Sequence, residues 1–270
     1  MPISNASELL GKINKKAFVV HEALEKFFFE CNTVDLGRLI FVEKGVIHIK
    51  VVGKQLLVPP GYCAWIPANT QHEIWANTND VFLRNVYFES SFCKDPCFHF
   101  MAIFNCSNLY SSMIRHTLKW SGLVEEDDSE LTFTRVLRQM MPEEMKSAFA
   151  VSLPSTDHPQ LQEVLTYIHD NYENSVKVND LAKVSNMSLR SLQRLFNTET
   201  GISFSSYVKL IRIIKAVELL STTKMRISEV AWDVGYNSIP TFTNTFKELT
   251  GQRPDYFQNN SSKLLSKTKK

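Results

Sequence analysis

The sequence has little glycine, 9 residues in 270, and no uninterrupted apolar run of about 18 residues. The first shortage argues against glycine-rich loops that cradle phosphate, and the second against a helix that spans a bilayer. Five cysteines at irregular spacings predict no disulfide framework. The first residues lack the basic-then-apolar order of a signal peptide, so we expect a cytoplasmic chain with no membrane partner.

What the chain does contain is a globular composition with an uneven charge distribution. Hydrophobic residues make up 44% and charged residues 21%, which is typical of a folded, water-exposed domain. Residues 1–156 hold 15 basic and 17 acidic residues, whereas residues 157–270 hold 15 and 11. This asymmetry predicts two domains with different partners, although a small positive surplus alone does not establish nucleic-acid binding.

Short apolar runs alternate with turn signals in the first third of the chain. The runs occupy residues 38–42, 46–52, 55–58, 63–66, 72–75 and 81–88. Glycine, proline and asparagine clusters separate them, a pattern that predicts an antiparallel sandwich or barrel. Helical periodicity follows at 109–120 and 131–140, split by the acidic stretch 125–128. The polar, proline-bounded stretch 154–159 predicts a linker, and everything beyond it is predicted to be helical.

The second half contains a diverged internal repeat. Its first copy consists of Leu181, Ala182, Ser188, Leu192, Phe196, Thr200 and Gly201, and its second of Val230, Ala231, Ser238, Phe242, Phe246, Thr250 and Gly251. The offset is 49 residues up to the alanines and 50 from the serines onward, so one residue has been inserted in the intervening turn. In both copies the glycine is placed to end a helix in the left-handed conformation.

Each copy follows the pattern of a helix-turn-helix. In the first, a helix over 178–184 is followed by a turn and by Ser188, a good N-cap for a helix over 189–199. Leu192, Leu195 and Phe196 form its apolar stripe. The opposite face carries Arg190, Gln193, Arg194 and Asn197. Arginine can bind guanine and glutamine can bind adenine in a major groove, whereas an ordinary surface helix would show a similar polar face.

The second copy repeats this arrangement without arginine. A helix over 227–233 is followed by a turn, the N-cap Ser238, and a helix in which Pro240 occupies the first turn. Ile239, Thr241, Thr243 and Asn244 face outward, which predicts contacts with thymine methyl groups and a weaker sequence preference. Residues 204–221 between the copies would form a helix of about 27 Å, able to hold two recognition helices near one DNA turn apart.

The second half resembles the AraC/XylS family of bacterial transcription regulators over residues 160–258. The matching residues are Leu181-Ala182, Met187-Ser188, 192–196, 200–203, Tyr207, Arg212, Ala216, Leu219-Leu220, Ile227, Val230-Ala231, Gly235-Tyr236, Phe242, 245–247, Gly251 and Pro254. The resemblance implies that the two units lie in successive major grooves. It also implies that Arg190, Gln193, Arg194, Ile239, Pro240, Thr241 and Asn244 contact bases. The chain departs from the family pattern at Phe204, Asn244 and Phe257.

The first half resembles the cupin-type sensor domain of the same family. Gly61, Pro67 and His72 match the spacing Gly-x5-Pro-x4-His of the second cupin signature. The first signature, which supplies most metal ligands, is absent, because His48 is followed two residues later by Lys50. We therefore expect no metal and no cofactor. We expect His72 to bind a small ligand or to close a strand turn.

Two other groups of residues suggest chemistry. Trp65 and Trp75 each carry an indole N–H that needs a partner when buried, so they join His72 as candidates for an effector pocket, with a plain sandwich core as the alternative. The cysteines at 93, 97 and 106 with His99 do not have zinc-site spacing. No catalytic motif stands out, so we expect no enzyme and no catalytic residue.

The sequence as a whole predicts an α+β chain that regulates transcription. We expect a cupin-like antiparallel β-barrel sensor domain over 1–108, a helical dimerisation and linker segment over 109–156, an all-helical domain with two helix-turn-helix units joined by a long helix over 157–260, and a basic tail over 261–270. The expected DNA-binding residues are Ser188, Arg190, Gln193, Arg194, Asn197, Ile239, Pro240, Thr241 and Asn244.

The expected partners are double-stranded DNA, a small-molecule effector and a second copy of the chain, with RNA polymerase as a further candidate. One alternative is a cupin-type metal-dependent enzyme with a helical appendage, which would contain stoichiometric metal. A nucleoid-type binder without sequence preference is another, and the arginine and glutamine of the first unit argue against it.

Overall fold

The computed structural model of the chain describes residues 17–31, 35–93, 95–120, 122–124, 129–149 and 151–259. The described chain divides into two compact units. We call the described residues of 17–49 and 58–149 the N-terminal unit, and residues 50–57 with 151–259 the C-terminal unit. Within these residues, no helix is long and apolar enough to cross a membrane.

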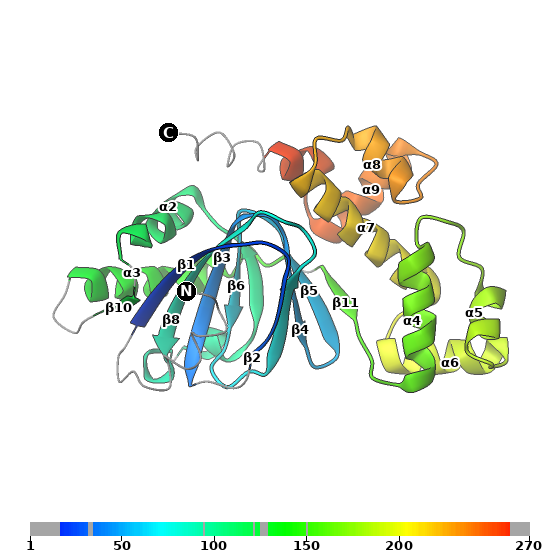
Figure 1. The fold of residues 1–270 in the computed structure, drawn as a ribbon, viewed down its shortest axis with the longest axis horizontal. Helices are drawn as coiled ribbons and strands as arrows, with labels where there is room; N and C mark the ends of the chain where they lie inside the picture. Colours follow the sequence, from blue (N-terminus) through cyan, green and yellow to red (C-terminus); the bar gives the residue numbers. More distant parts are fainter. Residues whose placement is uncertain are drawn as a thin grey trace. The chain divides into compact units, whose positions relative to one another are not determined.

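The described strands between residues 17 and 154 form two antiparallel sheets (Figure 1). The strands are β1 (Ala17–Leu24), β2 (Phe27–Cys31), β3 (Leu36–Lys44), β4 (Ile47–Val51), β5 (Lys54–Val58), β6 (Tyr62–Ile66), β7 (His72–Ala76), β8 (Val81–Glu89), β9 (Ala102–Asn105), β10 (Gly122–Val124) and β11 (Ser152–Pro154). One sheet has the order β10-β1-β8-β3-β6-β9 and the other β11-β5-β4-β7-β2. The antiparallel, cupin-like prediction is confirmed, with the refinement that the described strands pair as two sheets and not as one closed barrel.

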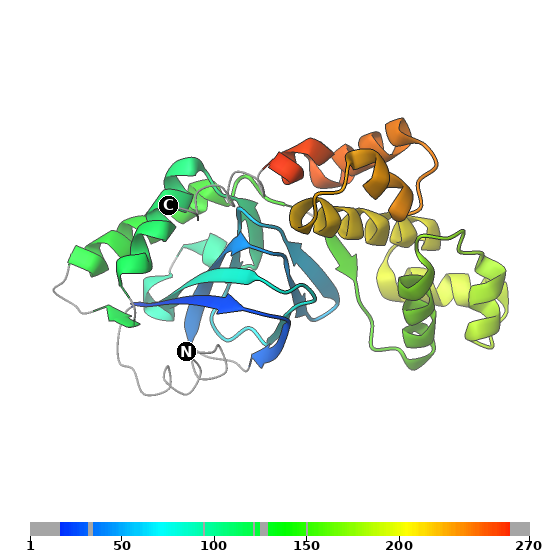
Figure 2. The same cartoon turned by 45° about the horizontal axis from the view of Figure 1, so that its top comes forward.

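Helices cover one face of the six-stranded sheet (Figure 2). They are α2 (Asn108–His116), which continues into the short helix η3 (Thr117–Lys119), and α3 (Ser129–Glu144). Tyr110 and Ile114 of α2 and Leu137 of α3 are fully buried against Leu39 and Val86 of the sheet. Both helices lie where the sequence predicted them, and the acidic stretch 125–128 lies outside the described residues.

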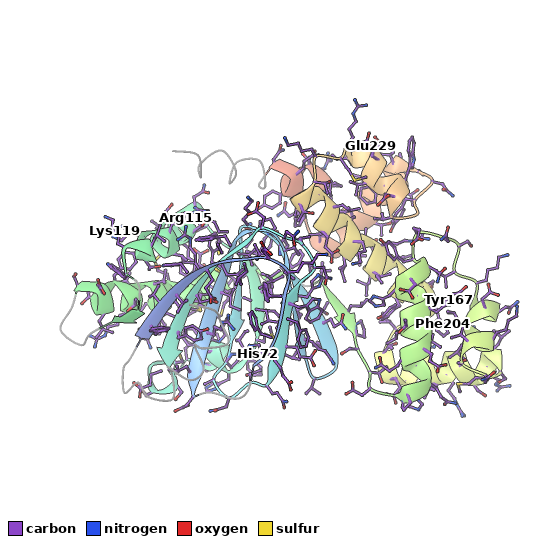
Figure 3. The ribbon with its side chains drawn as sticks, viewed as in Figure 1. His72, Arg115, Lys119, Tyr167, Phe204 and Glu229 are labelled. Atoms are coloured by element: carbon purple, nitrogen blue, oxygen red, sulfur yellow. The ribbon has the colours of Figure 1, made fainter. Side chains whose placement is uncertain are left out.

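An ion-pair network attaches α2 to the sheet beneath it. Glu43 of β3 accepts hydrogen bonds from Arg84 Nε of β8 at 2.7 Å and from Arg115 Nε of α2 at 2.8 Å. The guanidinium of Arg115, which Figure 3 labels on α2, also lies 5.3 Å from the centre of the Phe41 ring. These side chains are largely buried, so the network is screened less by salt than a surface ion pair would be.

Trp65 is part of this helix-covered core. Its side chain is fully buried, packs edge-on against Phe98, and donates its indole N–H to the carbonyl oxygen of Phe98 at 3.0 Å. Phe98 belongs to η2 (Pro96–His99), which follows η1 (Ser90–Phe92). A Cβ at Gly37 would lie 2.2 Å from the Trp65 ring, so only glycine fits beneath the indole.

The C-terminal unit is helical apart from the β5–β11 pair. Its helices are α4 (Pro159–Asn171), α5 (Val178–Val184), α6 (Leu189–Thr200), α7 (Phe204–Thr222), α8 (Ile227–Asp233) and α9 (Ile239–Thr250), and residues 254–259 are also helical. The sequence predicted α5 to α9 to within about one residue at each end. It missed β11, whose Ser152 pairs with Leu56 of β5 at the start of the predicted linker.

The long helix α7 forms the centre of the C-terminal unit and contacts α6, α8 and α9 (Figure 2). Two of the residues that depart from the family pattern are buried here. Phe204, the first residue of α7 (Figure 3), packs with a tilted ring against Phe196 of α6, with ring centres 4.0 Å apart. Phe257 packs against Phe246 of α9. The departures at 204 and 257 therefore fill the core with aromatic rings.

Candidate functional site

The helix-turn-helix formed by α5 and α6 presents a polar face to solvent. Ser188 begins α6, and its side chain accepts a hydrogen bond from the Ser191 N–H, while Gly201 ends the helix with φ of 72°. Leu192 and Phe196 are fully buried, and Leu195 is half-buried. The exposed residues are Arg190, Gln193, Arg194 and Asn197. The predicted base-reading face is thus accessible along the whole helix.

The unit formed by α8 and α9 has the same construction. Ser238 accepts a hydrogen bond from the Thr241 N–H, and Gly251 ends α9 with φ of 73°. Phe242 and Phe246 are fully buried. Of the outward residues predicted from the sequence, Ile239, Pro240, Thr241 and Asn244 are exposed, and Thr243 is half-buried.

Sequence reasoning missed one exposed residue at the start of α6. Leu189 is 42% exposed, and its counterpart in the second unit, Ile239, is 40% exposed. Both follow the N-cap serine directly, 50 residues apart. A large apolar side chain left in solvent at the same point of both helices suits contact with a thymine methyl group. The offset of the repeat was the signal that could have identified Leu189.

Hydrogen bonds identify equivalent residues in the two units and locate the inserted residue. Met187 N–H donates to the Ala182 carbonyl at 3.2 Å, and Tyr236 N–H donates to the Ala231 carbonyl at 2.8 Å, an offset of 49. The N-cap serines that follow are offset by 50. The additional residue is therefore Asn237, immediately before the second recognition helix.

One arginine joins the two halves of the C-terminal unit. Arg212 of α7 donates from Nε to the Tyr172 carbonyl at 2.7 Å, from Nη2 to the Asn174 carbonyl at 2.9 Å, and from Nη1 to the Gly235 carbonyl at 3.0 Å. The first two acceptors follow α4 and the third lies in the turn of the second helix-turn-helix. Arg212 thereby fixes the second turn against the end of α4.

Gly235 shows how closely these segments approach. Its φ is 86°, and a Cβ there would lie 2.3 Å from the Glu173 carbonyl oxygen and 2.9 Å from the Arg212 guanidinium. The left-handed conformation and the lack of space both require glycine.

The three candidates for an effector pocket lie on different surfaces of the N-terminal unit. Trp65 belongs to the core under the helices. His72 and Trp75 are three residues apart on β7, so they point to opposite faces of their sheet. His72 is buried, whereas Trp75 is half-buried and stacks on His48 with ring centres 5.1 Å apart. The structure does not bring these three side chains into one site.

A buried polar cluster lies on the face of the six-stranded sheet that the helices do not cover. Arg38 and Asn85 adjoin Leu39 and Val86 of the helix-covered core, so they point to the other side. Arg38 donates from Nε and Nη2 to Asn85 Oδ1 at 3.1 and 2.9 Å. Asn85 Nδ2 donates to Glu22 Oε2 of β1 at 3.2 Å. All three side chains are at least nine-tenths buried.

Two acceptor atoms near this cluster are buried without a hydrogen-bond partner, Glu22 Oε1 and His72 Nε2. Burial raises the pKa of Glu22 to about 7, although the positive charge of Arg38 acts to lower it. Burial, with a smaller contribution from Arg38, lowers the pKa of His72 to about 4. The neutral imidazole donates from Nδ1 to the Thr70 carbonyl at 2.8 Å, so Nε2 carries a lone pair (Figure 3).

The cysteines and histidines that the structure describes do not form a metal site. Among the described residues there is no group of three or more His, Cys, Asp or Glu side chains that could hold a metal ion. Cys63, Cys93, Cys97 and Cys106 are free thiols. The cluster of Arg38, Asn85 and Glu22, with His72 within electrostatic range of Arg38, instead offers hydrogen-bond donors and acceptors among buried side chains.

Comparison with known proteins gives matches in both halves. Residues 181–260 match the model of a helix-turn-helix domain family, and residues 18–97 match that of an AraC-like ligand binding domain. The chain is 30% identical over 226 residues to the Arabinose operon regulatory protein of Escherichia coli (strain K12), covering 76% of this chain and 72% of that protein.

Two further relatives cover different shares of the chain. The Msm operon regulatory protein of Streptococcus mutans is 25% identical over 257 residues, which are 92% of this chain and 86% of that protein. The uncharacterized HTH-type transcriptional regulator YfiF of Bacillus subtilis is 38% identical over 103 residues, so the chain spans 32% of its length.

Proposed function

The chain belongs to the AraC family of DNA-binding transcriptional regulators, with an AraC-like ligand-binding domain before its helix-turn-helix domain, and we propose that it reads a two-part DNA site under the control of a small polar molecule. The observation that carries the first part is the pair of capped, exposed recognition helices α6 and α9 on one central helix. The 19 residues of α7 extend about 28 Å, comparable with one DNA turn.

In this proposal the two recognition helices use different chemistry. Arg190, Gln193, Arg194 and Asn197 of α6 read base edges by hydrogen bonds, because arginine and glutamine can each bind one base through two bonds. Ile239, Pro240, Thr241 and Asn244 of α9 read mainly by apolar contact. The N-cap residues Ser188 and Ser238 expose helix N-termini that bind phosphate and fix the register.

The effector binds at the cluster of Arg38, Asn85, Glu22 and His72. Glu22 Oε1 and His72 Nε2 are buried acceptors without a partner, and two ligand hydroxyls, one donating to each atom, would satisfy them. We infer an effector rich in hydroxyl groups. A thermal-shift comparison of polyols and sugars with aliphatic acids tests this choice, and stabilisation by the acids alone would contradict it.

The helices α2 and α3 provide the surface for a second copy of the chain. Leu109, Leu118 and Val136 are large apolar residues that are 62%, 54% and 42% exposed in this segment. Exposed apolar side chains on α2, η3 and α3 suit a helical dimer interface. The same proposal includes four expectations from the sequence: RNA polymerase as a partner, a cytoplasmic location, the predicted domain limits and the absence of catalysis.

Selection of bound duplexes from a random DNA pool at physiological salt tests the two-part reader. We expect enrichment of two informative boxes about 10 base pairs apart. The salt concentration must be fixed, because phosphate contacts are salt-dependent. Enrichment of one box would assign readout to one unit only. A pool that stays random with and without the stabilising polyol would contradict sequence-specific binding, and the metal content of the purified chain would then test the enzyme alternative.

A further inference from the structure

Two thiols of the N-terminal unit are in direct contact. Cys106 Sγ donates to Cys63 Sγ across 2.9 Å, although the residues are 43 positions apart in the sequence. Both are free cysteines. A disulfide needs an S–S distance of about 2.05 Å, so only a small approach of the two side chains separates the thiols from a bond.

The strand pairing explains why these two residues meet. β6 and β9 are antiparallel, with Tyr62 opposite Asn105 and Cys63 opposite Phe104. The pairing extends one residue further, because Cys106 N–H donates to the Gly61 carbonyl at 3.4 Å. Cys106 is therefore the first residue after β9, the strand that pairs with β6, which contains Cys63. Both side chains pack in the helix-covered core. The contact is held by backbone pairing and does not depend on a flexible loop.

The two thiols differ in their access to solvent. Cys63 is fully buried, and burial raises its pKa well above the ordinary value. Cys106 is only half-buried. Because only Cys106 of this pair is partly exposed, we expect a small reagent to react first at Cys106 and Cys63 to react with the sulfur then held at position 106.

We propose that Cys63 and Cys106 form a reversible disulfide when the protein meets a low-molecular-weight disulfide such as oxidised glutathione. Cys106 attacks the reagent, and one small thiol leaves with a proton. Cys63 then attacks the Cys106 sulfur of the mixed disulfide, and the second small thiol leaves with the second proton. The two cysteines are oxidised by two electrons, and one small disulfide is reduced to two thiols.

The bond would restrain the start of α2. Cys106 precedes Ser107, whose side chain accepts a hydrogen bond from the Tyr110 N–H and whose own N–H donates to Glu144 at the end of α3 at 2.8 Å. Oxidation would therefore connect β6 covalently to the point where α2 begins and α3 ends. The hydroxyl of Tyr110 is buried without a hydrogen-bond partner, and burial raises its pKa, with smaller contributions from charge on Cys63 and Cys106.

Peptide mapping of the full-length chain tests the disulfide. The reduced protein is incubated with oxidised glutathione, its remaining thiols are alkylated, and the digest is analysed by mass spectrometry. We expect a peptide that links Cys63 to Cys106, lighter by two hydrogens than its reduced parts and lost after treatment with a reductant. Cys97→Ser, a half-buried thiol of the same core, serves as the matched control and should form the same link.

Two further variants separate the roles of the thiols. Cys63→Ala, with Cys63→Ser as a second choice should alanine impair folding, is expected to retain glutathione on Cys106, whereas the wild type does not accumulate it. Equal amounts of glutathione on Cys106 in both proteins, or links through Cys31, Cys93 or Cys97 instead, would overturn the proposal. Hydrogen exchange of the first turn of α2 should slow on oxidation, and unchanged exchange would refute the restraint.

Discussion

At the scale of single residues, the two recognition helices share an apolar residue and differ in charge. Leu189 and Ile239 occupy equivalent exposed positions after the N-cap serines. Arg190 and Arg194 have no basic counterpart among the exposed residues of the first two turns of α9. Since the guanidinium group is the side chain best suited to bind guanine, discrimination among bases should depend mainly on α6.

Replacing Arg194 with alanine should weaken binding to the selected DNA site by about 1–3 kcal/mol and relax one base position. The physical reason is the loss of hydrogen bonds to a base edge from an exposed guanidinium. Competition binding on the selected site and on its single-base variants measures both effects. Arg253→Ala removes the same charge outside the recognition helices and should weaken all sequences by a similar factor. An equal loss on selected and scrambled DNA for Arg194→Ala would contradict base readout.

Two glycines with positive φ should respond differently to substitution. Gly251→Ala meets nothing within 4 Å, so it should cost only the strain of the left-handed conformation, about 1–2 kcal/mol. Gly235→Ala adds a collision with the Glu173 carbonyl oxygen and should cost about 3 kcal/mol or more. Urea unfolding of the two variants measures the difference. Equal free energies of unfolding would show that the turn relaxes without cost.

At the scale of helices and strands, the sequence predicts best what is determined locally. The ends of α6 and α9 follow from Ser188, Gly201, Ser238 and Gly251, because caps act within one turn of their own helix. The strand β1 was missed, since His21 and Glu22 interrupt its apolar pattern. Their partners come from distant segments, Thr117 of η3 for His21 and Asn85 of β8 for Glu22.

The buried polar cluster was beyond sequence reasoning for the same reason. Arg38 bonds to Asn85 across 47 residues, and Asn85 to Glu22 across 63. No local pattern marks such pairs, because strand pairing alone determines which residues become neighbours. Of the pocket residues proposed from the sequence, His72 is within electrostatic range of Arg38, whereas Trp65 belongs to the helix-covered core and Trp75 stacks on His48.

Replacing Arg212 with methionine should loosen the fixed spacing between the two recognition helices. The change removes three hydrogen bonds from a guanidinium to carbonyl oxygens and should destabilise the C-terminal unit by about 2–4 kcal/mol. Binding is then measured on sites whose two boxes are moved apart by one base pair. The wild type should lose more affinity on the altered spacing than the variant does.

The control for this variant lies on the same helix. Lys209→Met changes an exposed side chain of α7 and should leave both stability and spacing preference close to those of the wild type. An Arg212→Met protein that kept the full spacing preference would show that packing around α7 alone fixes the two units.

At the scale of the whole molecule, the buried cluster makes stability depend on pH. Folding raises the pKa of Glu22 from 4.5 to about 7, so the folded chain retains a proton that the unfolded chain releases in this range. The free energy of unfolding should therefore fall as the pH rises from about 4.5 to about 7. Glu22→Gln should be more stable than the wild type by about 1–3 kcal/mol at pH 8, and equally stable below pH 4.

Urea unfolding across this pH range measures the effect, with the exposed Glu25→Gln as the control. His72 acts in the opposite direction. Its folded pKa of about 4 lies below the ordinary 6.5, so stability is lost as the pH falls through this interval. The Glu22→Gln protein should retain this acid-side loss. A Glu22→Gln curve parallel to that of the wild type throughout would show that Glu22 carries no such linkage.

The residue Asn237, inserted before the second recognition helix, also gives the molecule a direction. The two helix-turn-helix units differ in turn length as well as in exposed side chains. The C-terminal unit therefore has no two-fold symmetry. Under the two-part readout that we propose, the site of one chain is therefore not a palindrome, because its two halves differ. Inverting such a site in front of a gene would invert the orientation in which the protein is bound. Searches of a genome for these sites must therefore treat the two strands separately.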